Sequence, residues 1–113
     1  MQQYRLFQYQ GLLWDFIDIM HSGSLGYDSS KFFYYENVAT INAENLDCVS
    51  GIVNGADTPP NFFPHAECRS LKVGDIVMDD QKKFFMCDPV GWTEVEVPSM
   101  YKDVAPDLWG ADA

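Results

Sequence analysis

Hydrophobic and polar residues follow their most regular pattern between residues 70 and 97. Three short apolar runs, at 76–78, 84–87 and 92–97, are separated by two polar stretches that each begin with Asp. The second stretch also contains Pro89, which fixes φ, and Gly91, which accepts a positive φ. The pattern predicts a meander of three antiparallel strands joined by two tight turns.

The last apolar run alternates between two kinds of residue, as a strand at the surface of a sheet does. Its two faces carry Trp92, Glu94 and Glu96 on one side and Thr93, Val95 and Val97 on the other. Ahead of the first run, Gly74 and Asp75 indicate a further turn, in which Gly74 takes a conformation that other residues avoid. We expect the Asp75 carboxylate to accept hydrogen bonds from backbone amides there.

The N-terminal part of the chain predicts one strand, over residues 1–10, followed by one helix, over residues 12–21. In the helical segment apolar residues recur at the i, i+3, i+4 and i+7 positions that share one face of a helix. These residues are Leu13, Phe16, Ile17 and Met20. Gly23 follows and favours the left-handed conformation that ends many helices.

The middle of the chain predicts a second strand and a second helix. β-Branched and aromatic residues dominate residues 31–41, which is typical of a strand. Asn42 is a typical N-cap, so we expect a helix over residues 43–54 that ends at Gly55. Its apolar stripe consists of Leu46, Val49 and Val53. Residues 55–69 contain three prolines and predict a loop, which Phe62 and Phe63 anchor to the core.

These elements together predict a single α+β domain over residues 1–97. We expect a mainly antiparallel sheet that ends in the three-stranded meander, with the two helices packed on one of its faces. Residues 98–113 form a C-terminal segment that is acidic and contains proline.

Composition and targeting signals indicate one small cytoplasmic protein. The chain has 113 residues, of which 47% are hydrophobic, and this is enough for one modest core. It has no apolar run near the roughly 20 residues that span a bilayer and no secretory signal. Its three cysteines, Cys48, Cys68 and Cys87, are odd in number and widely spaced, which is typical of reduced thiols.

The net charge of −10, from 17 acidic and 7 basic residues, narrows the possible partners. Direct binding to nucleic acid or to an anionic membrane is disfavoured, because their phosphates would be repelled. Two interpretations of the charge stay open. It is either a solvated coat that keeps the protein soluble or an attraction to a basic surface on another protein.

The acidic residues near the C-terminal end are the candidate contact with such a partner. Glu94 and Glu96 lie about 7 Å apart on one strand face. Trp109 either folds back over the core or belongs to a docking segment of acidic and aromatic residues. The candidate partner-binding residues are Asp79, Asp80, Glu94, Glu96, Tyr101, Asp103, Asp107 and Trp109.

Residues suited to metal or catalytic chemistry are few. His65 and Cys68 form one H-x-x-C pair, but a structural zinc site usually has two such pairs, so we expect no metal. No pattern brings a Cys together with a His and an orienting group, and no glycine-rich phosphate loop occurs. We expect no cofactor and no catalytic residue. Gly74, Asp75, Gly91 and Trp92 are interpreted as a structural motif.

Three stretches of the chain resemble a known family. They are residues 4–8 (YRLFQ), 70–77 (SLKVGDIV) and 84–92 (FFMCDPVGW). In this order they resemble small YodL-like proteins and related short proteins of phages and mobile elements, which share an SLSVGDV…FGW signature. The resemblance implies a fold and a phage or mobile-element context, with action in the host cytoplasm. It implies no activity and no catalytic residues.

Three kinds of function are compatible with these observations. The first is a non-enzymatic protein-binding module, such as a phage-encoded modulator that binds a basic surface on a host protein. The second is a structural component of a virion or another assembly. The third is a small ligand-binding domain or enzyme, which a pocket with converging polar groups would favour.

Overall fold

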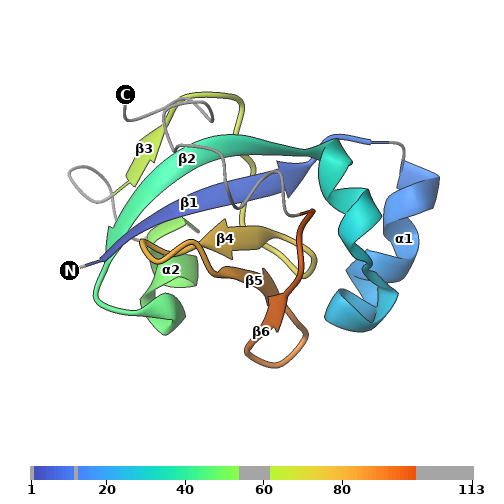
Figure 1. Cartoon of the computed structure of the whole chain (residues 1–113). Coiled ribbons are helices and arrows are strands. Elements are labelled where there is room, and N and C mark those ends of the chain that lie inside the picture. Colours follow the sequence, from blue (N-terminus) through green and yellow to red (C-terminus); the bar gives the residue numbers. More distant parts are fainter. Residues whose placement is uncertain (1, 12, 54–61, 99–113) are drawn as a thin grey trace.

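The computed structural model describes residues 2–11, 13–53 and 62–98, and its six strands form one antiparallel sheet (Figure 1). Along the sheet the strand order is β3-β2-β1-β4-β5-β6. The strands are β1 (Gln2–Tyr9), β2 (Tyr35–Ala43), β3 (Phe62–Pro64), β4 (Ile76–Met78), β5 (Phe84–Cys87) and β6 (Trp92–Val95). The helices are α1 (Leu13–Ser22), α2 (Leu46–Val53) and the 3-10 helices η1 (Gly23–Gly26) and η2 (Ser29–Tyr34). This arrangement confirms the predicted α+β class.

The sheet consists of two meanders that meet where β1 pairs with β4. Strands β4, β5 and β6 form the predicted C-terminal meander, and the predicted first strand is β1. β1 and β2 are the long, curved pair in Figure 1. Their register shifts between Leu6 and Phe7, which leaves Val38 of β2 as the extra residue of a bulge.

Both faces of the central strands are apolar, and each face has its own core. β4 shows this most clearly, because successive residues of a strand point to opposite faces. Ile76 and Met78 belong to one core, and Val77 between them belongs to the other. Each apolar face of the sheet must therefore be shielded from water by another part of the chain.

The two helices provide this shielding from opposite sides of the sheet. Phe16 and Ile19 of α1 belong to the first core, with Ile76 and Met78, and Val49 and Val53 of α2 belong to the second. Figure 1 shows α1 beyond one end of the β1–β2 pair and α2 near the other end. The prediction that both helices pack on one face was therefore wrong. The run Ile76-Val77-Met78 is apolar at every position, which is the pattern of a strand buried on both faces.

Helix α1 presents much of its predicted stripe to the core, because Phe16 is buried and Met20 packs against the first core. Ile19 is fully buried, whereas Ile17, a member of the predicted stripe, is 40% exposed. Phe16 and Ile19 approach the sheet closely because Gly74 has no side chain. A Cβ atom on Gly74 would lie 2.8 Å from Phe16 Cζ and 2.9 Å from Ile19 Cγ2. Gly23, with φ of 61°, follows the helix as predicted.

The strand predicted over residues 31–41 begins later, at Tyr35, and continues to Ala43. Residues 29–34 form η2 instead. Asp28 caps this helix, because its Oδ1 atom accepts a hydrogen bond from Ser30 N at 2.9 Å. Phe32 then packs between Phe7 and Phe84, with ring centroids 5.3 and 5.4 Å away. The cap and the aromatic packing override the β propensity of this segment.

Asn42 lies within β2, so the predicted N-cap was wrong. Asn45 lies at the start of the helix instead, and its Oδ1 atom accepts a hydrogen bond from Cys48 N at 3.2 Å. Helix α2 accordingly begins at Leu46 rather than at residue 43. Val49 and Val53 are buried and Leu46 packs against them, which confirms the predicted stripe. The predicted end at residues 54 and 55 lies outside the described residues.

The loop predicted over residues 55–69 contains the edge strand β3, which pairs with β2. Phe62 packs against the second core, but Phe63 is 43% exposed and does not anchor the segment. Pro64 is tolerated here because an edge strand has one side free of ladder bonds. Residues 99–113, which make up most of the predicted acidic segment, lie outside the described part of the chain. Among the described residues no helix is long and apolar enough to cross a membrane.

Candidate functional site

The predicted acidic residues fall in different parts of the molecule. Glu94 and Glu96 are exposed at the edge strand β6 and just beyond it. Asp79 and Asp80 lie in the turn between β4 and β5. Four further candidates, Tyr101, Asp103, Asp107 and Trp109, lie outside the described residues.

The turn between β4 and β5 carries both signs of charge. Asp79 Oδ1 accepts hydrogen bonds from Gln81 N and Lys83 N, both at 2.9 Å, so Asp79 shapes the turn. Lys82 and Lys83 follow the two aspartates after Gln81 and balance their charge. This turn is therefore not an acidic patch.

A groove of about 340 Å³ lies between β6 and the segment that joins η1 to η2. Three of its lining residues are acidic, namely Asp28, Glu94 and Glu96. Among the described residues no Lys, Arg or His lines it. The nearby Lys31 donates its Nζ proton to the carbonyl oxygen of Gly26, at 3.1 Å. The lining residues are Ser24, Tyr27, Asp28, Ser29, Thr93, Glu94, Val95 and Glu96.

Asp88 joins the two walls of the groove at one end. Its carboxylate accepts hydrogen bonds from Ser24 N at 2.7 Å, from Ser24 Oγ at 2.9 Å and from Thr93 Oγ1. Burial raises the pKa of Asp88, but these hydrogen bonds outweigh burial and hold its pKa below the usual value. Asp88 is thus ionised at neutral pH and holds η1 against the turn between β5 and β6.

Tyr27 joins the walls at the other end. Its hydroxyl donates a hydrogen bond to the backbone oxygen of Glu96, at 2.7 Å. Burial raises the pKa of the Tyr27 hydroxyl, and the charges of Asp28 and Glu96 raise it further. The hydroxyl therefore keeps its proton and remains a donor. The Ser30 side chain and backbone hold the pKa of Asp28 below its usual value, so this carboxylate is charged as well.

The backbone of β6 directs alternate groups toward β5 and toward the groove. In an antiparallel pair, residues that exchange hydrogen bonds alternate with residues that do not. Cys87 of β5 directs its N–H and C=O away from β6, toward the turn before β4. Its N–H donates to Asp75 O at 2.8 Å, and its carbonyl oxygen accepts from Gly74 N at 2.9 Å. Cys87 and its partner Trp92 are therefore a pair without mutual hydrogen bonds.

The same alternation runs along the rest of β6. Thr93 and Val95 pair with β5 through their backbone groups, whereas Glu94 and Glu96 direct theirs outward. The bond from Tyr27 to the Glu96 carbonyl oxygen lies on this outer side and agrees with the assignment. In the described part of the chain β6 has a strand neighbour on one side only.

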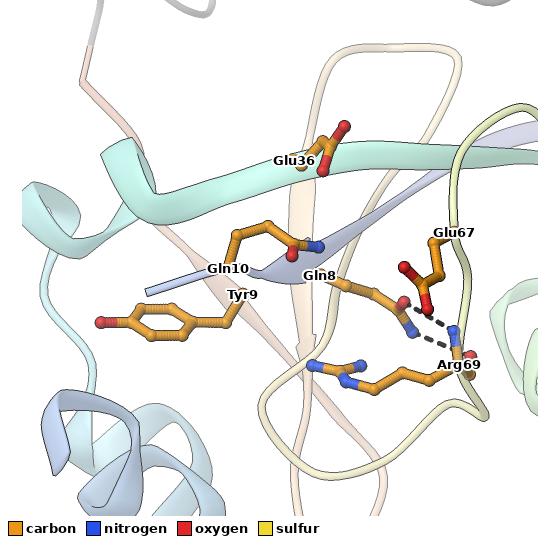
Figure 2. A pocket seen from close by; sticks show the side chains of 6 residues that line it. All are labelled: Gln8, Tyr9, Gln10, Glu36, Glu67 and Arg69. Atoms are coloured by element: carbon orange, nitrogen blue, oxygen red, sulfur yellow. Dashed lines mark hydrogen bonds between the residues drawn. The ribbon is translucent and has the colours of Figure 1, made fainter. Parts of the chain in front are cut away.

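A second cavity, of about 440 Å³, lies where β1 ends and β2 begins. Figure 2 shows its lining side chains, Gln8, Tyr9, Gln10, Glu36, Glu67 and Arg69. The side chain of Gln8 reaches across to the backbone of Arg69. Gln8 Nε2 donates to Arg69 O at 3.0 Å, and Arg69 N donates to Gln8 Oε1 at 3.1 Å. These two bonds hold the segment before β4 against β1.

Asp75 is fully buried and bonds two of the residues that line this cavity, Gln8 and Arg69. Its carboxylate accepts hydrogen bonds from Lys72 N at 3.0 Å, from Gln8 Nε2 at 3.1 Å and from Arg69 Nη1 at 2.9 Å. Burial raises the pKa of Asp75, and the Arg69 guanidinium opposes that rise. The bond from Lys72 confirms the predicted acceptor for a backbone amide. Sequence reasoning missed Gln8 and Arg69, because nothing local pairs Asp75 with a residue 67 positions away.

The remaining residues of the predicted structural motif shape the meander. Gly74 has a φ of 99° and Gly91 a φ of 75°, the conformation that the sequence pattern predicts. Trp92 packs against the second core.

The thiols and the histidine of the H-x-x-C pair do not form a ligand cluster. Across residues 2–11, 13–53 and 62–98 no three His, Cys, Asp or Glu side chains gather as metal ligands would. Cys48 is exposed on α2, and Cys68 and Cys87 are partly buried. Burial raises the pKa of the Cys68 thiol and raises that of Cys87 to about 11. Both thiols are therefore protonated at neutral pH and are weak nucleophiles.

Sequence reasoning also missed one wall of the groove, formed by Ser24, Tyr27 and Asp28. The signal available was the run Asp28-Ser29-Ser30 ahead of an apolar stretch, which is typical of a helix N-terminus. This signal predicts that Asp28 caps a helix, but it does not predict that Asp28 lies beside Glu94. The groove and its charges are thus the basis for a functional interpretation. No protein-family model, curated protein or solved structure matches this chain.

Proposed function

We propose that this protein is a small, non-enzymatic protein-binding module that binds a basic surface on another protein. The observation that supports this most directly is the groove beside β6, where three of the lining residues are acidic. Complementary charge speeds the encounter with a basic partner and disfavours acidic ones. The net charge of −10 acts in the same direction over a longer range.

The titratable groups favour binding over catalysis. Asp75 has no exposed surface, and Gln8, Arg69 and a backbone amide already engage its carboxylate. The Cys68 and Cys87 thiols have raised pKa values. Neither group offers a base or a nucleophile to a substrate in solution.

The resemblance to YodL-like proteins suggests the setting in which such binding takes place. A phage or mobile element would encode the protein, and a host protein in the cytoplasm would be its target. Proteins that handle nucleic acid carry the basic surfaces that an acidic groove fits.

A pull-down from bacterial lysate, followed by mass spectrometry, tests the proposal with matched charge variants. Glu94→Lys with Glu96→Lys reverses two charges in the groove, and Glu36→Lys with Glu67→Lys reverses two at the second cavity. We expect basic proteins to bind the wild type and the Glu36/Glu67 variant, but not the Glu94/Glu96 variant. Binding should fall steeply between low and physiological salt, since screening acts over about 8–10 Å.

Two results would contradict the proposal. One is a partner that stays bound in high salt or to the Glu94/Glu96 variant. The other is an equal loss of binding in both variants, which would assign the effect to net charge rather than to the groove. Light scattering of the purified protein adds a separate check. Ordered oligomers at low concentration would favour a structural role in an assembly.

The second cavity supports one other candidate function, the binding of a small polar ligand. Its volume of about 440 Å³ lies within the usual range for ligand pockets, and most of its lining side chains are polar or charged. A thermal-shift screen of polar metabolites tests this candidate. A ligand that stabilises the wild type but not the Glu36/Glu67 variant would establish it.

A further inference from the structure

We infer that the partner contributes an extended basic segment, which adds to the sheet as an antiparallel strand beside β6. This inference rests on the proposed function and specifies how the partner binds. It follows from the outer edge of β6, where Glu94 directs its N–H and C=O away from β5. Among residues 2–11, 13–53 and 62–98 no strand pairs with this edge, and a sheet edge without a partner strand is a ready template for another strand.

The two ends of the groove limit the length of the added segment. Asp88 ties Ser24 to Thr93 at one end, and the Tyr27 hydroxyl occupies the Glu96 carbonyl oxygen at the other. The edge between Trp92 and Glu96 spans roughly 13 Å, at about 3.3 Å for each residue. The groove therefore accepts about four residues of extended chain.

Charge complementarity identifies the chemistry of the segment. Glu94 and Glu96 point to the same face of the strand, because side chains alternate. In an antiparallel pair, the residue opposite Glu94 exchanges backbone hydrogen bonds with it and directs its own side chain to the same face. Basic residues at alternate positions would thus lie beside Glu94 and Glu96. Asp28 adds negative charge from the opposite wall.

Three synthetic peptides separate strand addition from simple charge attraction. The parent peptide alternates lysine and valine. One derivative carries N-methyl groups on its lysine amides, and the other carries them on its valine amides, so charge is equal in all three. The inference predicts that methylation of the lysine amides weakens binding by about tenfold or more, because those N–H groups face β6. Methylation of the valine amides should have little effect.

Two protein variants probe the same edge. Glu94→Gln removes the charge, and Glu94→Pro removes both the charge and the outward N–H. Proline at this position leaves the bonds to β5 intact, because an edge strand tolerates proline where its N–H faces outward. The inference predicts that Glu94→Pro binds the parent peptide about tenfold more weakly than Glu94→Gln does. Amide exchange of Glu94 in the wild type, which should slow when peptide is added, provides a readout that needs no variant.

The outcomes distinguish the inference from the proposed function. If both methylated peptides bind as well as the parent, while salt and Glu94→Lys abolish binding, strand addition is wrong and the proposed function stands. If Glu94 exchange is unchanged at saturating peptide, strand addition is likewise wrong. If the parent peptide does not bind at low salt, both ideas fail.

Discussion

Two turns of this molecule each combine an aspartate with a glycine of positive φ. Gly74 and Asp75 precede β4, and Asp88 and Gly91 connect β5 to β6. Their sequence signals are similar, and Gly74, Asp75 and Gly91 were interpreted as parts of one structural motif. Their surroundings in the folded protein differ greatly.

The turn before β4 is a junction between distant parts of the chain. Gly74 lies under α1, and its carbonyl oxygen accepts a hydrogen bond from the Tyr35 hydroxyl at 2.6 Å. Asp75 is fully buried and joins β1 through Gln8. Tertiary contacts therefore determine how much a substitution in this turn lowers the free energy of unfolding.

The turn between β5 and β6 lies at the surface. A Cβ atom on Gly91 would have no other atom within 4 Å, and the neighbouring Val90 is 91% exposed. Asp88 bonds Ser24 and Thr93, and through Ser24 it reaches η1. The comparison shows that the same pair of residue types can form either a buried junction or a turn at the surface that holds one neighbouring helix.

Alanine at the two glycines gives the largest expected difference. Gly74→Ala combines left-handed strain with overlap against Phe16 and Ile19, so we expect a loss of about 4 kcal/mol in the free energy of unfolding. Gly91→Ala introduces the left-handed strain without any overlap, so its free energy of unfolding should fall by about 1 kcal/mol. Urea unfolding of both variants measures the difference. Equal losses would show that α1 does not press on Gly74.

Alanine at the two aspartates should give a smaller difference in the same direction. Asp75→Ala leaves Arg69 without its buried partner and should cost about 3 kcal/mol, the lower end of the range for a broken buried pair, since the Arg69 side chain is 34% exposed. Asp88→Ala removes hydrogen bonds near the surface and should cost about 1 kcal/mol. The same urea experiment applies. A larger loss for Asp88→Ala would mean that η1 depends on this turn more than β1 depends on Asp75.

The pH dependence of stability should also distinguish the two aspartates. The expected effect is the smallest of the three, but Asp88 and Asp75 should change the free energy of unfolding in opposite directions as the pH falls. The pKa of Asp88 is lowered in the folded state, so its contribution to stability is present above its unfolded pKa, near 4, and is lost as the pH falls through the folded value. The pKa of Asp75 is raised, so its contribution is largest in acid and declines as the pH rises through the folded value.

Isosteric amides test these signs. Asp88→Asn should make the loss of stability in acid shallower, and Asp75→Asn should make it steeper. Unfolding free energies measured from about pH 6 down to about pH 3 check both slopes. A shallower acid loss in Asp75→Asn would mean that Arg69 lowers the pKa of Asp75 more than burial raises it.

Several elements were predictable because their signals are local. The C-terminal meander depends on short apolar runs and on turn residues within a few positions of each other. The stripe of Leu46, Val49 and Val53 depends on a period of 3.6 residues within one helix. The positive φ of Gly74 and of Gly91 follows from residue type in a turn.

Other features depend on residues that are far apart in the chain. Phe32, Phe33 and Tyr34 have high β propensity, yet residues 29–34 are helical, because Phe32 packs against the distant Phe7 and Phe84 as well as following the Asp28 cap. The bond from Gln8 to Asp75, 67 residues away, and the bond from Tyr27 to the Glu96 backbone, 69 residues away, have no local signal. The groove exists only because these segments meet.

Local sequence thus accounts for the α+β class, the meander and the turn glycines, since backbone preference and side-chain period act over a few residues. Packing accounts for the placement of α1 and α2 on opposite faces, because both sides of β1 and β4 are apolar and each must be covered. Packing also brings Asp28 beside Glu94 and leaves the outer edge of β6 without a strand neighbour in the described part of the chain. The placement of the helices and the formation of the groove both depend on contacts between residues that are far apart in the chain. Such contacts form only when the whole chain folds.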